Sequence, residues 1–278
     1  MTTPTTGAGG RPAGRRQQAE PLRREVSPET QAESTPRTGA TLDAAAWLAS
    51  ASIDPAVAAL RPDYHALLIT AEGLRPGPSD AFSEEMLARA EVTARERIGD
   101  GPLEEHPHIA AWREAFRSFG AKPQRTRPSA EALLRRAADG LPRVDRLTDI
   151  YNAVSVGHFL PLGGEDLDHY AGPARLVRAD GTEVFDTTAG GEPATEHPAA
   201  GEVVWRDDLG VTCRRWNWRQ CTRTRLTHDT TRALFILDAL GAMDDQALSA
   251  AGDALTDALT TSSPEVKINT RLLRASAA

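Results

Sequence analysis

The stretch from Glu202 to Leu240 constrains the fold of this chain more than any other. It begins with two short apolar segments on either side of Asp208-Leu209-Gly210, a pattern that predicts two strands joined by a turn. The apolar run from Thr230 to Leu240 near its end is typical of a helix or of a buried strand. Between them lies the polar aromatic segment Trp216–Gln220, where a purely structural hairpin would alternate apolar and solvent-facing residues. This segment is therefore a candidate substrate site.

If residues 211–220 form one strand, alternation sorts the side chains of this segment onto two faces. One face carries Arg215, Asn217 and Arg219, and the other carries Arg214, Trp216, Trp218 and Gln220. Arginine and amide groups suit an ester, a phosphate or a ribose hydroxyl, and indoles stack on bases or pack in a core. The alternative is that the tryptophans belong to the core and the arginines are solvated.

Composition excludes several classes of protein. The 278 residues carry a net charge of −7, which argues against a nucleic-acid binder that works by bulk charge. No apolar run approaches the length of a membrane span, and no secretory signal is recognisable, so we expect a soluble chain. The two cysteines, Cys213 and Cys221, have no CxxC spacing, which fits a reducing cytoplasm and gives no metal site. Nucleotide-loop, zincin and hydrolase-elbow motifs do not occur, so we expect no cofactor.

We expect three regions along the chain. Residues 1–38 are rich in Pro, Thr, Ser, Gly and Gln, which predicts a disordered basic tail, either a solvated extension or a phosphate contact. Residues 41–260 are expected to form a single domain, and residues 261–278 a C-terminal tail.

Several elements are predicted inside the domain. A strand is expected at Tyr64–Ala71, and helices at Ser79–Ile98 (capped by Ser83), His108–Phe119, Ala130–Ala138 (capped by Ser129) and residues 244–260. In the second helix, Trp112 and Phe116 are interpreted as packing residues. Residues 174–187 predict a strand pair around Asp180-Gly181, Pro161–Asp168 predicts a loop, and residues 147–156 are helix or strand.

Two local features add candidates for the site. A basic cluster made of Lys122, Arg125, Arg127, Arg135, Arg136, Arg143 and Arg146 is either a phosphate-binding patch or a solvated face with ion pairs. Asn152 stands in an apolar run, where a buried amide needs partners, and Gly163 and Gly164 permit close backbone approach. Cys221 is interpreted as a small residue in a strand, with a thiol nucleophile as the alternative.

The region from about His106 to Gly241 resembles the B3/B4 domain of the bacterial phenylalanyl-tRNA synthetase β chain in a free-standing form. The resemblance rests on an ordered set of segments: AWREAFRSFGAKP, RPSAEALLRRAADG, LPRVDRLTDIYNAVSV, PLGGEDLD, GEVVWRDDLGV, RRWNWRQ and RTRLTHDTTRALFILDAL. It implies an α+β fold with a mixed sheet flanked by helices.

The resemblance also assigns site residues. Asn152 matches an asparagine of the family, and Pro161, Leu162 and Asp166 match a Pro-Leu-His-Ala-Phe-Asp loop whose histidine is Gly163 here. Trp216–Gln220 replaces a Gly-Val-Met-Gly-Gly block, and Arg225 stands where the family has a glutamate that helps to recognise tyrosine. The editing pocket is thus expected to be rebuilt for another acyl group.

In the family this domain hydrolyses the ester of mischarged tRNA, so a free-standing copy implies a cytoplasmic trans-editing deacylase whose partner is the aminoacylated 3′ end of tRNA. The expected catalytic residues are Asn152, Gly163, Gly164 and Asn217. Substrate binding is expected from Arg215, Trp216, Trp218, Arg219, Gln220, Arg223, Arg225 and Asp166, and tRNA binding from Lys122, Arg125, Arg127, Arg135 and Arg136. The alternatives are a module that binds aminoacyl-tRNA or an amino acid without cleaving it, and an aminoacyl-tRNA-dependent transferase.

Overall fold

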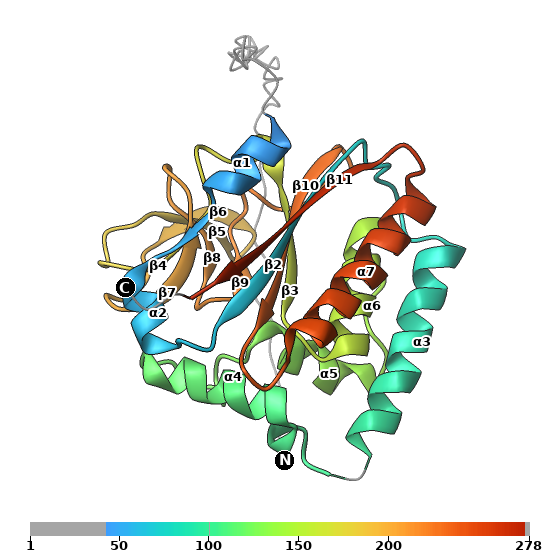
Figure 1. Cartoon of the computed structure of the whole chain (residues 1–278), viewed down its shortest axis with the longest axis horizontal. Coiled ribbons are helices and arrows are strands. Elements are labelled where there is room, and N and C mark those ends of the chain that lie inside the picture. The colour runs from blue at the N-terminus through green and yellow to red at the C-terminus, as the bar shows by residue number, and fades with distance from the viewer. Residues whose placement is uncertain (1–42, 100, 276–278) are drawn as a thin grey trace, which may run out of the picture. The chain divides into compact units, whose positions relative to one another are not determined.

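A four-stranded antiparallel sheet runs through the middle of the fold in this computed structural model (Figure 1). Its strands, in spatial order, are β11 (Lys267–Arg274), β2 (His65–Glu72), β10 (Arg232–Ala239) and β3 (Leu162–Asp166). The two central strands are apolar and almost completely buried, because both of their faces are covered. Helices α3 (Ala81–Ile98), α6 (Arg146–His158) and α7 (Asp245–Ser262) lie on one side of the sheet (Figure 1).

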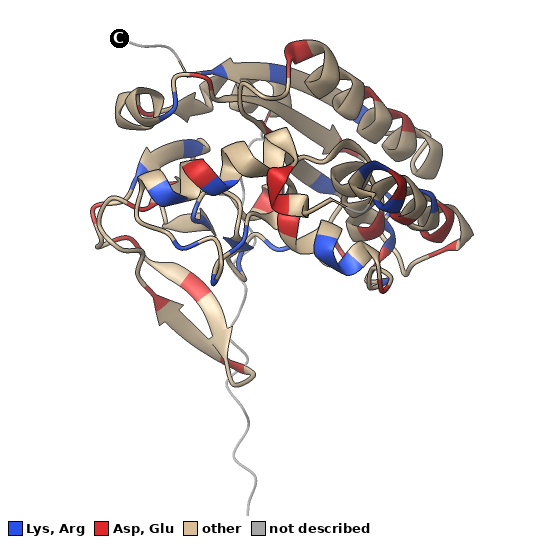
Figure 2. Cartoon of the chain, turned by 90° about the horizontal axis from the view of Figure 1, so that it is seen from below, with Lys and Arg blue, Asp and Glu red and all other residues tan. Residues whose placement is uncertain are grey.

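A second sheet lies on the other side of the first (Figure 1). Its strands, in order, are β1 (Ser52–Ile53), β4 (Arg175–Arg178), β7 (Val203–Arg206), β8 (Val211–Arg214) and β9 (Arg219–Gln220). The pair β1–β4 is parallel and the other pairs are antiparallel, so the sheet is mixed. Strands β5 (Phe185–Ala189) and β6 (Glu192–Glu196) form a separate hairpin that extends away from the rest of the fold (Figure 2).

The remaining elements connect these layers. They are α1 (Ala44–Ser50), α2 (Pro55–Leu60), α4 (Pro107–Ser118), α5 (Ser129–Ala137) and the short 3₁₀ helices η1 (Leu103–Glu105) and η2 (Leu167–His169). The structure describes residues 43–99 and 101–275, which belong to one compact unit. The basic tail expected at residues 1–38 lies outside this described part. No helix in the described ranges is both long enough and apolar enough to cross a membrane.

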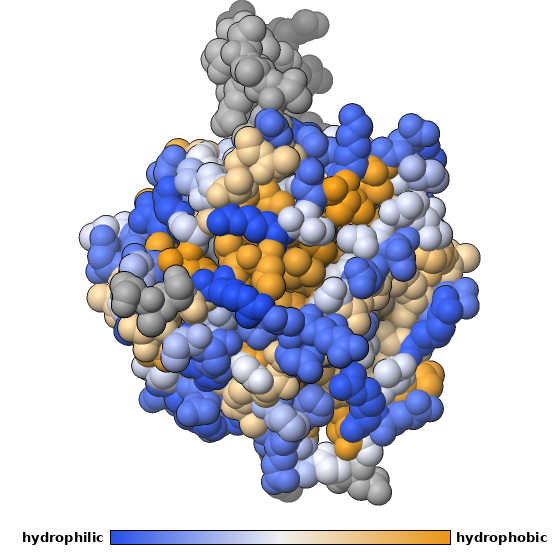
Figure 3. Space-filling view, in the orientation of Figure 1, coloured by the Kyte–Doolittle hydropathy of each residue, from blue (hydrophilic) through white to orange (hydrophobic). Residues whose placement is uncertain are grey.

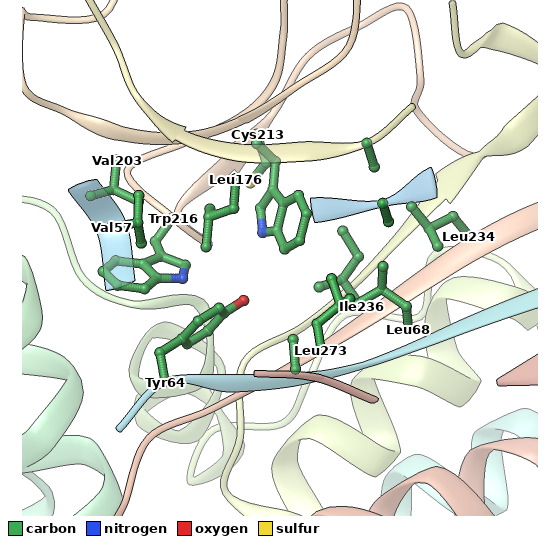
Figure 4. Close-up of a cluster of buried hydrophobic side chains, with 14 of the residues drawn as sticks. Val57, Tyr64, Leu68, Leu176, Val203, Cys213, Trp216, Leu234, Ile236 and Leu273 are labelled. Carbon is green, nitrogen blue, oxygen red and sulfur yellow. The ribbon is translucent and has the colours of Figure 1, made fainter. Parts of the chain in front are cut away.

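Large aromatic side chains fill the space between the two sheets (Figure 4). The rings of Tyr64 and Trp216 meet edge to face with centroids 4.9 Å apart, and Trp112 meets Trp216 in the same way at 5.4 Å. Edge-to-face contacts of this kind stabilise a core beyond the apolar area that they bury. On the face shown in Figure 3, an apolar area near the centre is bordered by hydrophilic residues.

The predicted α+β class is confirmed. The helices expected at His108–Phe119 and residues 244–260 are α4 and α7, and Trp112 and Phe116 are completely buried as packing residues. The ambiguous run at residues 147–156 is helical (α6), whereas the run at Thr230–Leu240 is strand β10.

Both predicted helix caps are wrong by a few residues. Asp80 rather than Ser83 begins α3, because its carboxylate accepts from the Ser83 amide while the Ser83 hydroxyl accepts from the Asp80 amide. At α5 the cap is Pro128, and Ser129 is already the first helical residue.

Three other predictions from the sequence are corrected. Pro161–Asp168 is not a loop: Leu162–Asp166 pairs with β10, and two glycines fit there because the strand is closely packed on both sides. The strands within residues 174–187 do not pair with each other, since β4 joins β7 and β5 joins β6. Residues 261–278 are not simply a tail: Lys267–Arg274 forms β11, which supplies β2 with a complete second hydrogen-bonding partner.

Candidate functional site

A cavity of about 650 Å³ opens between α5, α6, β3, β10 and the segment that follows β8. Its volume lies within the range of about 300–1,000 Å³ that is usual for small-molecule sites. Eleven residues selected from the sequence line it: Arg125, Arg127, Arg135, Arg136, Asn152, Gly163, Trp216, Asn217, Trp218, Arg219 and Gln220. The fold thus brings α6 with Asn152, β3 with Gly163 and the aromatic segment Trp216–Gln220 to one cavity. Four of the five residues expected to bind tRNA also line it.

The segment Arg215–Trp218 is a tight turn between β8 and β9, so the alternation expected for one continuous strand is wrong. Arg215 and Trp216 adopt left-handed backbone conformations, with φ of 49° and 68°. Non-glycine residues occupy this region only where the surrounding structure compensates for the strain. Here the Glu202 carboxylate accepts from the Arg215 amide at 3.2 Å, and the Val203 carbonyl accepts from the Trp216 amide at 2.7 Å.

The turn places its side chains in different environments. Trp216 is completely buried in the aromatic core and forms a wall of the cavity. Trp218 is partly exposed, and guanidinium groups of Arg215 and Arg219 lie 4.5 and 4.6 Å from its ring. Arg219 also forms a 2.6 Å ion pair with Glu196 of the β5–β6 hairpin. The Arg219 charge is therefore already neutralised by a protein carboxylate.

Arg215 and Arg223 were expected to bind substrate, but neither lines the cavity, and both are bound to other protein groups. Arg215 donates to Thr126 and lies 3.5 Å from Glu202. Arg223 forms a bidentate pair with Asp207, at 2.8 and 2.9 Å.

Three other expected site residues are also placed outside the lining. Asp166 accepts from Thr230 at 2.6 Å and from the Asp168 amide at 3.0 Å. Arg225 is exposed and makes an isolated bridge to the Glu165 backbone. Lys122 is exposed in the segment between α4 and α5.

Gly163 and Gly164 occupy opposite faces of β3. A Cβ atom on Gly163 would meet the Gln220 amide at 2.9 Å, whereas one on Gly164 would meet Leu226 and Phe235, also at 2.9 Å. Only Gly163 therefore lines the cavity. The Gly164 carbonyl lies in the plane of the sheet and accepts a 2.9 Å hydrogen bond from the Gln220 side chain, which ties β3 to the end of the aromatic segment.

Four exposed arginines line the mouth of the cavity: Arg125, Arg127, Arg135 and Arg136. Among the described residues, two of them form ion pairs and two do not. Arg127 and Arg135 lie 3.7 and 3.0 Å from the buried carboxylate of Glu131, and Arg135 also pairs with Glu104. Within the described part of the chain, no carboxylate forms an ion pair with Arg125 or Arg136, although both are exposed and line the cavity. These two guanidinium groups are available to an anionic ligand. Figure 2 shows how Lys and Arg are distributed over the fold.

The sequence reasoning missed Glu165, which follows the two glycines on β3. Its side chain lines the cavity and is 1% exposed. The carboxyl accepts hydrogen bonds from the Tyr170 hydroxyl and, at 3.2 Å, from Thr224. Burial raises the pKa of Glu165 to about 7, an effect that these hydrogen bonds only partly oppose.

A second missed carboxyl, Asp238, lies on β10 in the same cavity. The Tyr64 hydroxyl donates to Asp238 Oδ1 at 2.6 Å, and the Asn217 amide donates to Oδ2 at 3.3 Å. Burial raises the pKa of Asp238 to about 7 as well, against the effect of these donors. Two titratable groups poised near neutral pH in one cavity are characteristic of a functional site.

A signal for both carboxyls was present in the sequence. Asp238 stands in the run ALFILDAL and Glu165 follows Leu-Gly-Gly, so each is an acidic residue in a segment that has to be buried. Like Asn152, both carboxyls are polar groups in apolar runs and need special partners, and burying them costs more free energy because they can carry charge.

The cavity also offers polar atoms without partners. Asn217 Oδ1, Trp205 Nε1, Trp216 Nε1 and Arg219 Nε are buried and make no hydrogen bond in the described part of the structure. Burial raises the pKa of the Cys213 thiol in the cavity wall and that of the Cys221 thiol behind it, which disfavours the reactive thiolate. Among the described residues, no group of His, Cys, Asp and Glu is arranged to hold a metal ion.

Comparison with known proteins identifies the domain. Residues 111–258, more than half of the chain, match the B3/4 domain, which confirms the resemblance predicted from the sequence. Among solved structures, an N-terminal fragment of the phenylalanyl-tRNA synthetase β subunit from Pyrococcus horikoshii is similar, with 15% sequence identity and a TM-score of 0.40. The match covers 79% of this chain and 50% of that one, so the chain spans about half the length of this relative. No curated protein matches.

Proposed function

Because the chain belongs to the B3/4 domain family, we propose that it is a trans-editing deacylase, which hydrolyses the ester of a mischarged aminoacyl-tRNA. The observation that carries the proposal is the shared cavity: Asn152 of α6, Gly163 of β3 and Asn217 of the turn after β8 meet there below a mouth that carries unpaired arginines. An aminoacyl-tRNA end has the corresponding two parts, an acyl group that can enter a cavity and phosphates that remain outside.

The arginines would hold the phosphates of the tRNA terminus. Arg125 and Arg136 are suited to this role because they are exposed at the cavity and have no carboxylate partner among the described residues. Arg127, Arg135 and Lys122 would add to the same electrostatic surface, although Arg127 and Arg135 are already partly neutralised by Glu131. Trp218, Gln220 and Arg219 line the cavity beside this mouth and would contact the terminal nucleoside.

Hydrolysis needs an oriented water and donors for the negative charge that develops on the ester oxygen. The water oxygen adds to the carbonyl carbon, the bond to the ribose oxygen breaks, and that oxygen leaves with a proton to give free amino acid and deacylated tRNA. The side-chain amides of Asn152 and Asn217, which line the cavity, would supply donors. Among the residues that the structure describes, the Asn217 side-chain amide donates only to Asp238, which leaves its second N–H for a substrate.

A specific observation favours a second candidate, a module that binds aminoacyl-tRNA without cleaving it. Arg215 and Arg223 are engaged by protein groups, and no histidine lines the cavity in the described residues.

A panel of aminoacyl-tRNAs separates the candidates. Each would be incubated with the protein and the remaining ester measured over time, with Asn152→Ala and Asn217→Ala as test variants and Glu114→Gln, an exposed residue of α4, as a control. We expect faster loss of at least one ester, reduced by both Asn variants and unchanged in the control. Tight, salt-dependent tRNA binding with no ester loss for any member would identify a binding module. Transfer to an added amine would identify a transferase.

A further inference from the structure

We propose that the floor of the cavity binds a cation on the side chain of the acyl group, so that the substrate is an aminoacyl-tRNA charged with a basic amino acid. This inference rests on the proposed function and specifies its substrate class. The mouth of the cavity carries arginines, whereas its floor carries two carboxyls and aromatic rings.

Burial divides the cavity into a mouth and a floor. The arginines of the mouth are exposed, and Trp218, Arg219 and Gln220 are half-buried. Glu165, Asp238 and Trp205 are at most 3% exposed and belong to the innermost lining. A ligand held by its phosphates at the mouth would therefore reach these groups with the end of its side chain.

The floor carries three acceptor groups, beside which the indole N–H groups of Trp205 and Trp216 also lack partners. Glu165 and Asp238 lie on the same face of the central sheet, because Glu165 pairs with Leu234 and alternation returns Asp238 to the Leu234 side. Between them the register places Gly163 opposite Ile236, with no side chain at Gly163 to cover the sheet. The unpartnered Asn217 Oδ1 adds a third acceptor, which is more than nine-tenths buried. A ligand that donates several hydrogen bonds would satisfy this set.

No Lys or Arg of the described residues pairs with Glu165 or Asp238. Arg219 is paired with Glu196, and Arg127 and Arg135 are paired with Glu131. In the described part of the chain, neither Glu165 nor Asp238 forms an ion pair, and both retain hydroxyl or amide donors only. A glutamine and an asparagine would accept the same hydrogen bonds without the free-energy cost of ionising in a buried site. Acidic groups are useful at these positions if a ligand brings the opposite charge.

The walls next to the floor are aromatic, which suits a cation further. Trp205, Trp216 and Tyr151 line the cavity, and the electron-rich face of an aromatic ring attracts ammonium and guanidinium groups. Trp218 contributes less, because Arg215 and Arg219 already lie against its ring. The cavity therefore has a cationic mouth and a floor that combines acidic and aromatic groups. It is complementary to a ligand that carries phosphate at one end and a cationic amino-acid side chain at the other.

The test uses uncleavable analogues that differ only in the terminal cation. Adenosines carrying lysine or norleucine through a 3′-amide have side chains of similar length and the same α-ammonium group, so a difference in affinity reports the side-chain ammonium alone. Affinities would be measured by calorimetry near pH 8 with the full-length protein, Glu165→Gln and the control Glu114→Gln. We expect the wild type and the control to bind the lysyl analogue at least about tenfold more tightly, a preference typical of a charge-assisted hydrogen bond. Glu165→Gln should lose most of it.

Equal affinity of the wild type for the two analogues would overturn the inference, as would tighter binding of the norleucyl analogue. The wild-type comparison needs no variant, so the result stands even if Glu165→Gln folds poorly. If the protein prefers the lysyl analogue but hydrolyses no ester, the cation site is supported and the deacylase proposal is rejected. If it hydrolyses an ester without preferring lysyl- or arginyl-tRNA, the deacylase is supported and the cation site is rejected.

Discussion

The Tyr64 hydroxyl donates a 2.6 Å hydrogen bond to Asp238, joining the start of β2 to the end of β10 beneath the cavity. Both groups are buried, and burial raises the pKa of each, because neither charge is solvated there. The bond therefore connects the aromatic core with a polar group of the candidate site.

Replacing Tyr64 with Phe removes that donor and should destabilise the protein more at high pH than at low pH. Above pH 7 Asp238 is ionised and would lose its shortest hydrogen bond, at a cost of about 1–3 kcal/mol. At pH 5 the carboxyl is protonated and the loss should be smaller. Urea unfolding at pH 5 and pH 8 measures both values. A cost that is the same at the two pH values would show that the hydroxyl does not interact with the charge.

The two raised pKa values predict that the contribution of Glu165 and Asp238 to stability falls as the pH rises from about 4.5 to 7, whereas the lowered pKa values of His106, His108 and His158 act in the opposite direction. In this range the folded protein holds protons on Glu165 and Asp238 that the unfolded chain has released, so the contribution of these two groups falls with each pH step. The groups facing Glu165 are Tyr170, Thr224, Thr212 and Asp207, and those facing Asp238 are Tyr64, Asn217, Trp205 and Glu165. None of these neighbours is cationic, so none favours the ionised form by charge.

The double variant Glu165→Gln/Asp238→Asn checks this linkage. Its stability relative to the wild type should increase as the pH rises between 4.5 and 7, by a few kcal/mol at most. Thermal or urea unfolding across that range is the measurement. A wild-type profile that rises with pH in this window, and is unchanged in the variant, would contradict the assignment.

Alanine at the two glycines of β3 should have different effects. Gly164→Ala places a methyl group against Leu226 and Phe235 in the core, which we expect to cost about 1–3 kcal/mol. Gly163→Ala meets only the mobile end of Gln220, so its effect on unfolding should be below about 1 kcal/mol, while substrate binding is impaired because the methyl group enters the cavity. Urea unfolding and ligand affinity separate the two outcomes, and equal destabilisation by both would refute the assignment of the faces.

The unpaired arginines predict a specific dependence on salt. Arg125→Gln/Arg136→Gln should weaken tRNA binding and reduce the slope of log affinity against log salt by about two, one for each lost phosphate contact. Arg89→Gln is the control, because Arg89 is exposed on α3, outside the cavity lining, and pairs with Glu85. Binding titrations at several salt concentrations test the prediction. An unchanged slope in the double variant would show that Arg125 and Arg136 do not contact the tRNA phosphates.

Much of the site could be predicted because its residues conflict with their local pattern. Asn152 in an apolar run and Asn217 between two tryptophans were selected for that reason, and both line the cavity. The basic residues 125–136 were found by their density, but the sequence could not show that Glu131 on α5 forms ion pairs with two of them.

What failed depended on contacts between distant segments. Arg215 and Trp216 were expected in a strand, but their backbone amides donate to the Glu202 carboxylate and the Val203 carbonyl, which stabilises a left-handed turn there. The glycines of β3 favour a loop locally, and only pairing with β10 makes them a strand. Likewise, β11 was missed because its sequence contains few apolar residues. Its strand conformation depends on pairing with β2.

The position of β11 has a consequence for how the protein is made. Strand β2 lies between β10 and β11, both of which follow it at the far end of the chain, so on the ribosome β2 emerges long before either partner. Until then its apolar residues and both rows of backbone groups lack their native partners, which is the condition under which strands associate between chains. Folding dominated by such distant pairings is slow. We therefore expect nascent chains that end before Lys267 to depend on chaperones and to aggregate without them.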